Sequence, residues 1–131
     1  REDTMKKVLI IDDDPDIRDV LITILEGKYE LQETGSREEG MNAVKEFVPD
    51  LVILDVMLEK HDSGFEMSRE IKGDEQFKDI KVLMVTNVDA EMKMDFKKIA
   101  GDPDWLPVDD YVVKPIDPKD FLPKVEKLIG I

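Results

Sequence analysis

Carboxylates that directly follow apolar runs are the residues of this chain best suited to chemistry. The run at 8–11 leads into Asp12 and Asp13, and the run at 51–54 leads into Asp55. Short apolar runs without alternation are typical of strands buried on both faces of a parallel sheet. Because ligands bind at the carboxyl ends of such strands, we expect these three carboxylates to meet at one edge and form a cation or phosphoryl site.

A hydroxyl and an ammonium group are predicted to join them. Thr86 ends the apolar run at 80–85, and Lys114 follows the run at 110–113. Converging carboxylates repel one another, which raises their pKa values or recruits a cation, and oxygen ligands in a small cleft suit Mg²⁺. A magnesium ion, a lysine and a hydroxyl can together stabilise the oxygens of a phosphoryl group in transfer. An aspartate can act as the nucleophile, and we choose Asp55 because it stands alone on its strand.

Strand-like and helix-like stretches alternate five times along the chain. This alternation predicts an α/β fold, a doubly wound five-stranded parallel sheet with helices on both faces. The strands are expected at 6–11, 29–34, 51–54, 80–85 and 110–113. Each helix is expected to open on residues typical of N-caps and capping boxes, namely Asp14 with Pro15, Ser36 with Glu39, Ser63 with Glu66, Asp89, and Asp117 with Pro118.

Length and composition restrict the class of protein. At 131 residues the chain is expected to form one domain, and we assign 1–5 to a tail or cloning remnant and 6–131 to the domain. The net charge of −13 argues against nucleic acid as a partner, and no apolar run approaches the ~20 residues of a membrane span. Without cysteine, and with His61 as the one histidine, disulfides, thiolate chemistry and a histidine-rich metal site are excluded. We expect an acidic, cytoplasmic protein.

Four short segments carry a resemblance to a known family: Lys7-Val8-Leu9-Ile10-Ile11-Asp12-Asp13-Asp14-Pro15, Leu54-Asp55-Val56-Met57, Val85-Thr86, and Asp110-Tyr111-Val112-Val113-Lys114-Pro115. In this order they resemble the receiver domain of response regulators, the CheY-like signalling module of two-component systems. The resemblance covers the chain from Lys6 onward. It implies a CheY-like, flavodoxin-like sheet order and a protein that catalyses only its own phosphorylation and dephosphorylation.

The resemblance also implies a role for each matching residue. Asp55 would accept a phosphoryl group, and Mg²⁺ would be held by Asp12, Asp13, Asp55 and the backbone carbonyl of Met57. Thr86 and Lys114 would bind the phosphoryl oxygens, with a cis peptide bond between Lys114 and Pro115. Thr86 and Tyr111 would act as a switch that changes the face formed by the fourth helix, the fifth strand and the fifth helix.

The implied partners are proteins. A sensor histidine kinase or a histidine phosphotransfer protein would donate the phosphoryl group, and a downstream protein would read the changed face. The protein would be a monomer or a phosphorylation-dependent dimer, either a stand-alone receiver or a domain of a sensor kinase or transcription factor.

The sequence departs from the family pattern at three places. The loop at 58–63 is about one residue longer than usual, Asn87 replaces the usual alanine or glycine, and the segment between Thr86 and Lys114 carries extra residues at 101–108. Met57 and Val88, which would flank the phosphoryl group, cannot orient an attacking water. We therefore expect a phosphorylated form that is long-lived for the family.

Two other functions remain open from the residues alone. A haloacid-dehalogenase-type phosphohydrolase would use Asp12, Asp14, Thr86 and a lysine, but it would leave Asp55 without a role. A pseudo-receiver would bind partners without being phosphorylated, and Asn87 is the residue that keeps this alternative open.

Overall fold

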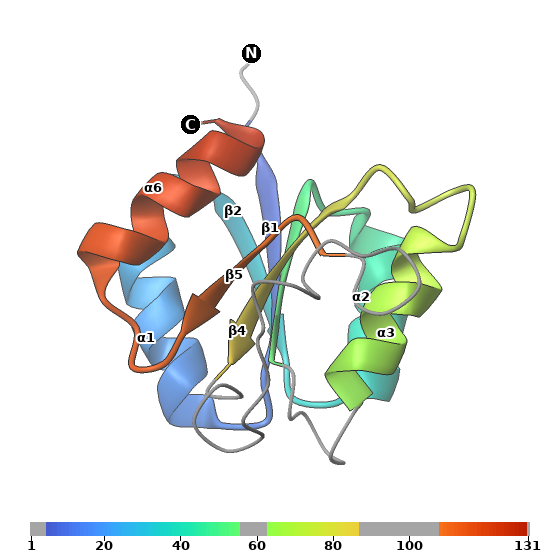
Figure 1. Cartoon of the computed structure of the whole chain (residues 1–131), viewed down its shortest axis with the longest axis horizontal. Coiled ribbons are helices and arrows are strands. Elements are labelled where there is room, and N and C mark those ends of the chain that lie inside the picture. Colours follow the sequence, from blue (N-terminus) through green and yellow to red (C-terminus); the bar gives the residue numbers. More distant parts are fainter. Residues whose placement is uncertain (1–4, 56–62, 87–107, 131) are drawn as a thin grey trace.

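The computed structural model describes residues 5–55, 63–86 and 108–130, and at 63–65 and 86 it describes the backbone alone. The strands are β1 (Lys7–Ile11), β2 (Glu30–Thr34), β3 (Leu51–Asp55), β4 (Lys81–Thr86) and β5 (Asp110–Val113). The helices in these ranges are α1 (Pro15–Leu25), α2 (Arg37–Phe47), α3 (Ser63–Lys72) and α6 (Pro118–Ile129). The strands form one five-stranded sheet in the order β2-β1-β3-β4-β5 (Figure 1).

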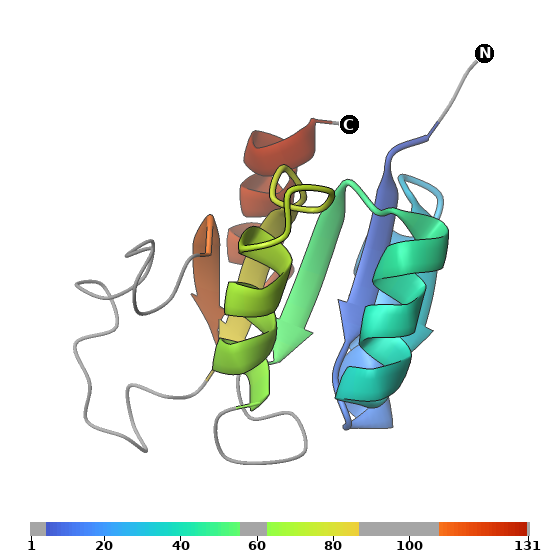
Figure 2. The same ribbon diagram turned by 90° about the vertical axis from the view of Figure 1, so that its right-hand side faces the viewer.

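All four strand pairings are parallel, and β3 lies at the centre of the sheet. Every residue of β3 is buried, whereas the edge strand β2 has no fully buried residue. This difference confirms the prediction that the apolar run at 51–54 forms a strand buried on both faces of the sheet. Figure 2 shows the strands side by side, with their carboxyl ends at one edge.

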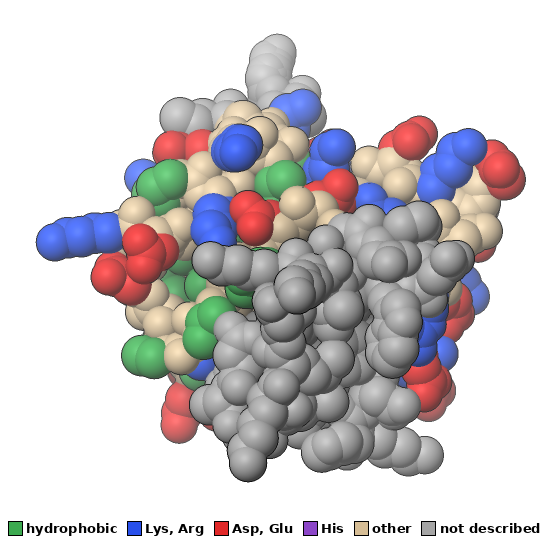
Figure 3. Space-filling model, viewed as in Figure 1, with side chains coloured by type: hydrophobic (Ala, Val, Ile, Leu, Met, Phe, Trp, Pro, Cys, Tyr) green, Lys and Arg blue, Asp and Glu red, His purple; other side chains and the backbone are tan. Residues whose placement is uncertain are grey.

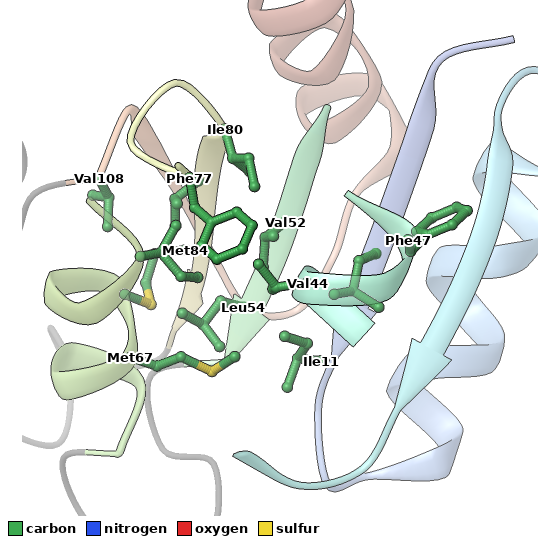
Figure 4. Close-up of a cluster of buried hydrophobic side chains, with 13 residues drawn as sticks. Ile11, Val44, Phe47, Val52, Leu54, Met67, Phe77, Ile80, Met84 and Val108 are labelled. Atoms are coloured by element: carbon green, nitrogen blue, oxygen red, sulfur yellow. The ribbon is translucent and has the colours of Figure 1, made fainter. Parts of the chain in front are cut away.

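Two apolar cores hold the helices on opposite faces of the sheet. On one face, α1 and α6 contribute Leu21, Leu25, Phe121 and Val125 to a core with the even-numbered residues of β1. On the other face, α2 and α3 pack on the odd-numbered residues of β1, as Figure 4 shows for Ile11, Val44 and Met67. The alternation of strand side chains thus fills both layers, and the predicted doubly wound fold is confirmed.

Three of the predicted helix starts are confirmed by hydrogen bonds. The side chain of Asp14 accepts from the backbone N–H of Asp16, that of Ser36 from Glu39, and that of Asp117 from Lys119. Helix α3 begins at Ser63, but the second capping box requires side chains that are outside the described set, and it stays a prediction. The helix expected to start at Asp89 also lies outside the described residues.

Some strand boundaries differ by one residue from the sequence prediction. β2 begins at Glu30, which pairs with Lys7, the first residue of β1. Tyr29 precedes the strand and packs into the core on the α1 side, where its hydroxyl donates a hydrogen bond of 2.7 Å to the carbonyl of Gly130. β4 runs from Lys81 to Thr86, one residue later than predicted at each end. Among the helices described, none is long and apolar enough to cross a membrane.

Candidate functional site

The three predicted acidic residues converge at the carboxyl edge of the sheet. Asp12 and Asp13 follow β1, Asp55 ends β3, and one carboxylate oxygen of each lies within 4.8 Å of the others. Asp12 and Asp55 are 2% and 4% exposed, whereas Asp13 is exposed to solvent. Neighbouring parallel strands β1 and β3 deliver these groups side by side, as the sequence predicted.

Lys114 supplies the positive charge next to this cluster. It follows β5 directly, and its Nζ lies 3.7 Å from Asp12 Oδ2 and 3.6 Å from Asp55 Oδ1. The Lys114–Pro115 peptide bond is cis, as expected from the resemblance. The lysine side chain, 22% exposed, therefore reaches the same space as the carboxylates from the opposite half of the sheet.

Burial and neighbouring charges shift the titration of Asp12. Burial is the largest cause and raises the pKa of the Asp12 carboxyl to about 6, and the charges of Asp55 and Asp13 add to the increase. The backbone N–H of Asp14, 2.9 Å from Asp12 Oδ1, and the charge of Lys114 act in the opposite direction. Within the described part of the chain, the buried Oδ2 of Asp12 has no hydrogen-bond donor.

The donor set fits a hard divalent cation. Buried carboxylate oxygens without a hydrogen-bond donor are uncommon in folded proteins because their desolvation costs free energy. Among the described residues, the nearest positive charge to Asp12 Oδ2 is Lys114 Nζ at 3.7 Å, and a cation bound between the three carboxylates would give this oxygen a direct ligand bond. Carboxylate oxygens are the protein ligands that Mg²⁺ selects.

Two of the predicted site residues are only partly described or lie outside the described residues. Thr86 is the last residue of β4, one position beyond Val85, which pairs with Asp55 across the sheet. The backbone of Thr86 thus lies at the same edge of the sheet as Asp55, but its side chain is outside the described set. Met57 and Asn87 lie outside it entirely, as does 101–107 of the predicted insert.

Tyr111 lies on β5, on the side of the sheet that packs against α2 and α3, and is partly buried. Lys124 of α6 donates a 2.6 Å hydrogen bond to the carbonyl of Tyr111, and its Nζ lies 5.3 Å from the centre of the Tyr111 ring. A groove of about 550 Å³ runs along β5 and the start of α6 and includes Tyr111, Val113 and Asp120 in its lining. Figure 3 shows hydrophobic side chains exposed among charged ones in this region.

One residue at the site was not singled out by the sequence prediction. Arg18, on α1, donates from Nη1 to the carbonyl oxygen of Asp12 at 2.5 Å and from Nε to Glu33 Oε1 at 2.8 Å. An arginine among helical residues indicates a solvated face when only the sequence is known. The fold gives it a contact with the backbone of the site.

The comparison with family models agrees with this geometry. The model of the response regulator receiver domain matches residues 8–126. The chain belongs to this family. It is a receiver domain of the two-component type, a signalling domain. The family assignment decides against the phosphohydrolase alternative.

Relatives and solved structures show how far the similarity extends. Over 126 residues, which are 95% of this chain and 49% of the relative, it is 36% identical to the DNA-binding dual master transcriptional regulator RpaA of Synechocystis sp.. A CheY-like receiver domain protein from Methanospirillum hungatei has a TM-score of 0.77 at 28% identity, covering 95% of this chain and 93% of that one. The receiver domain of the sensor histidine kinase PA1611 from Pseudomonas aeruginosa, with magnesium in its active-site cleft, has a TM-score of 0.79 at 17% identity, covering 98% and 100%.

The chain spans about half the length of the curated relatives it matches. The similarity to those proteins therefore concerns a receiver domain and not their full length. The DNA binding in the names of several relatives is a property of those whole proteins.

Proposed function

We propose that this receiver domain takes a phosphoryl group onto Asp55 in a Mg²⁺-dependent reaction. The observation that carries the proposal is the buried Asp55 carboxylate, which lies at the end of the central strand between two further carboxylates and the Lys114 ammonium group. A carboxylate in that position can act as a nucleophile. The proposed reaction also gives each of the other charged residues a role: Asp12 and Asp13 would bind Mg²⁺, and Lys114 would face the phosphoryl group.

In this reaction, a carboxylate oxygen of Asp55 attacks the phosphorus of a phosphohistidine. The bond from phosphorus to the imidazole nitrogen breaks, its electron pair stays on that nitrogen, and an acyl phosphate forms. Lys114, whose Nζ lies within 3.7 Å of both buried carboxylates, would neutralise the incoming phosphoryl oxygens.

Asp12, Asp13, Asp55 and, by the family resemblance, the carbonyl of Met57 would hold Mg²⁺. When bound, the ion would offset the negative charge of the carboxylates and of the phosphoryl group. Magnesium in the PA1611 receiver domain is in keeping with this assignment, although at 17% identity the likeness to that domain concerns the fold. The main support is the chain's own set of buried oxygens.

The proposed partners follow from the chemistry. A sensor histidine kinase or a histidine phosphotransfer protein would donate the phosphoryl group, and a downstream protein would read the face that contains Tyr111. The contacts of Lys124 with the carbonyl and ring of Tyr111 tie this residue to α6. A change at Thr86 and Tyr111 would therefore be transmitted to the groove between β5 and α6. The cytoplasmic location expected from the sequence stays a prediction.

Intact mass spectrometry tests the proposal. We expect the wild-type protein to gain one phosphoryl group from acetyl phosphate in the presence of Mg²⁺, and to gain none when the metal is chelated. Asp55→Asn should gain none under either condition while it still folds. A pseudo-receiver would show Mg²⁺ binding without any gain of mass.

The lifetime of the phosphorylated form is a second measurable property. Met57 and Val88 lie outside the described residues, and the expectation of a long-lived acyl phosphate stays a prediction. The decay of the phosphorylated mass after removal of acetyl phosphate measures it. A decay within seconds would contradict it.

A further inference from the structure

We propose that Arg18 is a positioning residue that sets the Mg²⁺ affinity of the site by holding the peptide group between Asp12 and Asp13. The inference rests on the proposed metal role of the acidic cluster. Arg18 itself lies on α1 and touches the site through the backbone and not through a carboxylate of the cluster.

The guanidinium of Arg18 joins the ends of two strands. Nη1 donates to the carbonyl oxygen of Asp12, just beyond β1, and Nε donates to Glu33 on β2. The Arg18 side chain is only 20% exposed. A Cβ placed on Gly35 would lie 3.1 Å from Nη1, so the glycine leaves the room that the guanidinium occupies. The planar donor fork of arginine suits two acceptors held at fixed positions.

The carbonyl of Asp12 belongs to the same peptide plane as the N–H of Asp13. Because Arg18 fixes this plane, it also fixes the direction in which the side chain of Asp13 leaves the backbone. Asp13 needs such control more than its two neighbours do. Asp12 and Asp55 are buried, whereas Asp13 is exposed, and no described side chain makes a hydrogen bond or ion pair with its carboxylate.

The electrostatic effect of Arg18 has the opposite sign. A positive charge near a cation site repels the cation, so its removal should strengthen Mg²⁺ binding if charge alone mattered. Loss of a residue that orients metal ligands typically weakens metal binding by about 10- to 100-fold. The direction of the change therefore separates positioning from charge.

The test is isothermal titration calorimetry of Mg²⁺ with the metal-free protein and with Arg18→Met, which keeps an unbranched side chain that extends to the position of Nε and removes the donors. We expect Arg18→Met to bind Mg²⁺ about 10-fold more weakly. The charge-matched control is Arg37→Met, because Arg37 bridges Glu66 and Glu70 between α2 and α3 and should not lose affinity. Equal or tighter binding by Arg18→Met would overturn the proposal.

A second variant guards against a general loss of structure. Glu33→Met removes the acceptor of Nε but leaves the bond to the Asp12 carbonyl, so it should weaken Mg²⁺ binding less than Arg18→Met does. Equal losses in the two variants would contradict a role for the carbonyl contact. The rate of phosphorylation by acetyl phosphate should recover in Arg18→Met at saturating Mg²⁺, and persistent loss at saturation would also overturn the proposal. If the wild type binds Mg²⁺ but gains no phosphoryl group, the proposed function fails while the role of Arg18 is still decided by the titrations.

Discussion

The protonation of the Asp12 carboxyl can be measured through its effect on the free energy of unfolding. Burial raises the pKa of its carboxyl from 3.8 to about 6, so between these values the folded protein holds a proton that the unfolded chain has released. Without metal, this group therefore makes its full contribution to stability below pH 4, and the contribution falls as the pH rises towards 6.

We expect the free energy of unfolding of the metal-free wild type, relative to Asp12→Asn, to fall by about 2 kcal/mol between pH 4 and 6. Subtracting the variant removes the pH dependence of the groups that do not interact with Asp12. Chemical denaturation at several pH values gives the measurement. A difference that is flat or rises over this range would contradict the account of Asp12.

The positions of the site residues were predictable where one short segment carries the signal. Asp12, Asp13, Asp55 and Lys114 each follow an apolar run, and the rule that strand ends share an edge was enough to bring them together. The contact of Arg18 with the site could not be predicted in this way. Its acceptors are the Asp12 carbonyl and Glu33, and the positions of these residues in the sequence form no recognisable motif with Arg18. Its role depends on how α1 lies across β1 and β2.

Helix α2 approaches the sheet closely at Gly40. A Cβ at this position would lie 2.7 Å from Ile11 Cδ1 and 3.0 Å from Met67 Cε, both in the core between α2 and α3 (Figure 4). We expect Gly40→Ala to be destabilising, because overpacking costs about 1–3 kcal/mol and the better helix propensity of alanine returns only about 1 kcal/mol.

A double-mutant cycle with Ile11→Val tests this contact, since valine lacks the Cδ1 atom. Ile11→Val should be less destabilising in the Gly40→Ala background than in the wild type. Additive effects in urea denaturation would show that the close approach does not determine the cost.

The carboxyl end of α3 is fixed to the amino ends of β4 and β5. Lys72 Nζ donates to Asp109 Oδ2 at 2.7 Å and to the carbonyl of Ile80 at 2.8 Å, while the backbone N–H of Val82 donates to the same Asp109 oxygen. We expect Lys72→Met to destabilise the protein by about 1–2 kcal/mol. The control is Lys78→Met, whose exposed pair with Glu75 should contribute less than about 0.5 kcal/mol. Equal effects in thermal denaturation would contradict the importance of the Lys72 contacts.

For the helices and strands, the sequence predicted the type and order of the elements better than it predicted the contacts between them. The N-caps Asp14, Ser36 and Asp117 were readable because each bonds to a residue two or three positions away. The hydrogen bond from Tyr29 to Gly130 joins residues that are 101 positions apart, and nothing in the local pattern indicates it. The predicted strand includes Tyr29, whereas the observed strand begins one residue later.

For the whole molecule, the alternation of strand-like and helix-like stretches sufficed to predict a five-stranded parallel sheet with helices on both faces. The chain as a whole carries a net charge of −13, and three of its carboxylates meet at the site. Mg²⁺ should thus act in two ways, by general screening and by binding between the carboxylates.

We expect Mg²⁺ at about 100 times its Kd to raise Tm by about 10 °C, because preferential binding to the folded state is then worth about 2.7 kcal/mol. Sodium chloride at the same ionic strength should raise it less. Asp12→Asn should reduce the difference between the two salts. If NaCl and MgCl₂ have equal effects on the wild type, the cluster is not a metal site.

The central claim is that Asp55 accepts the phosphoryl group, and reductive trapping tests it most directly. Borohydride converts an aspartyl phosphate to homoserine, which marks the residue permanently. After incubation with acetyl phosphate and Mg²⁺, peptide sequencing by mass spectrometry should find homoserine at position 55 and at no other aspartate. Homoserine at position 12 or 13, or none in a protein that binds Mg²⁺, would contradict the account.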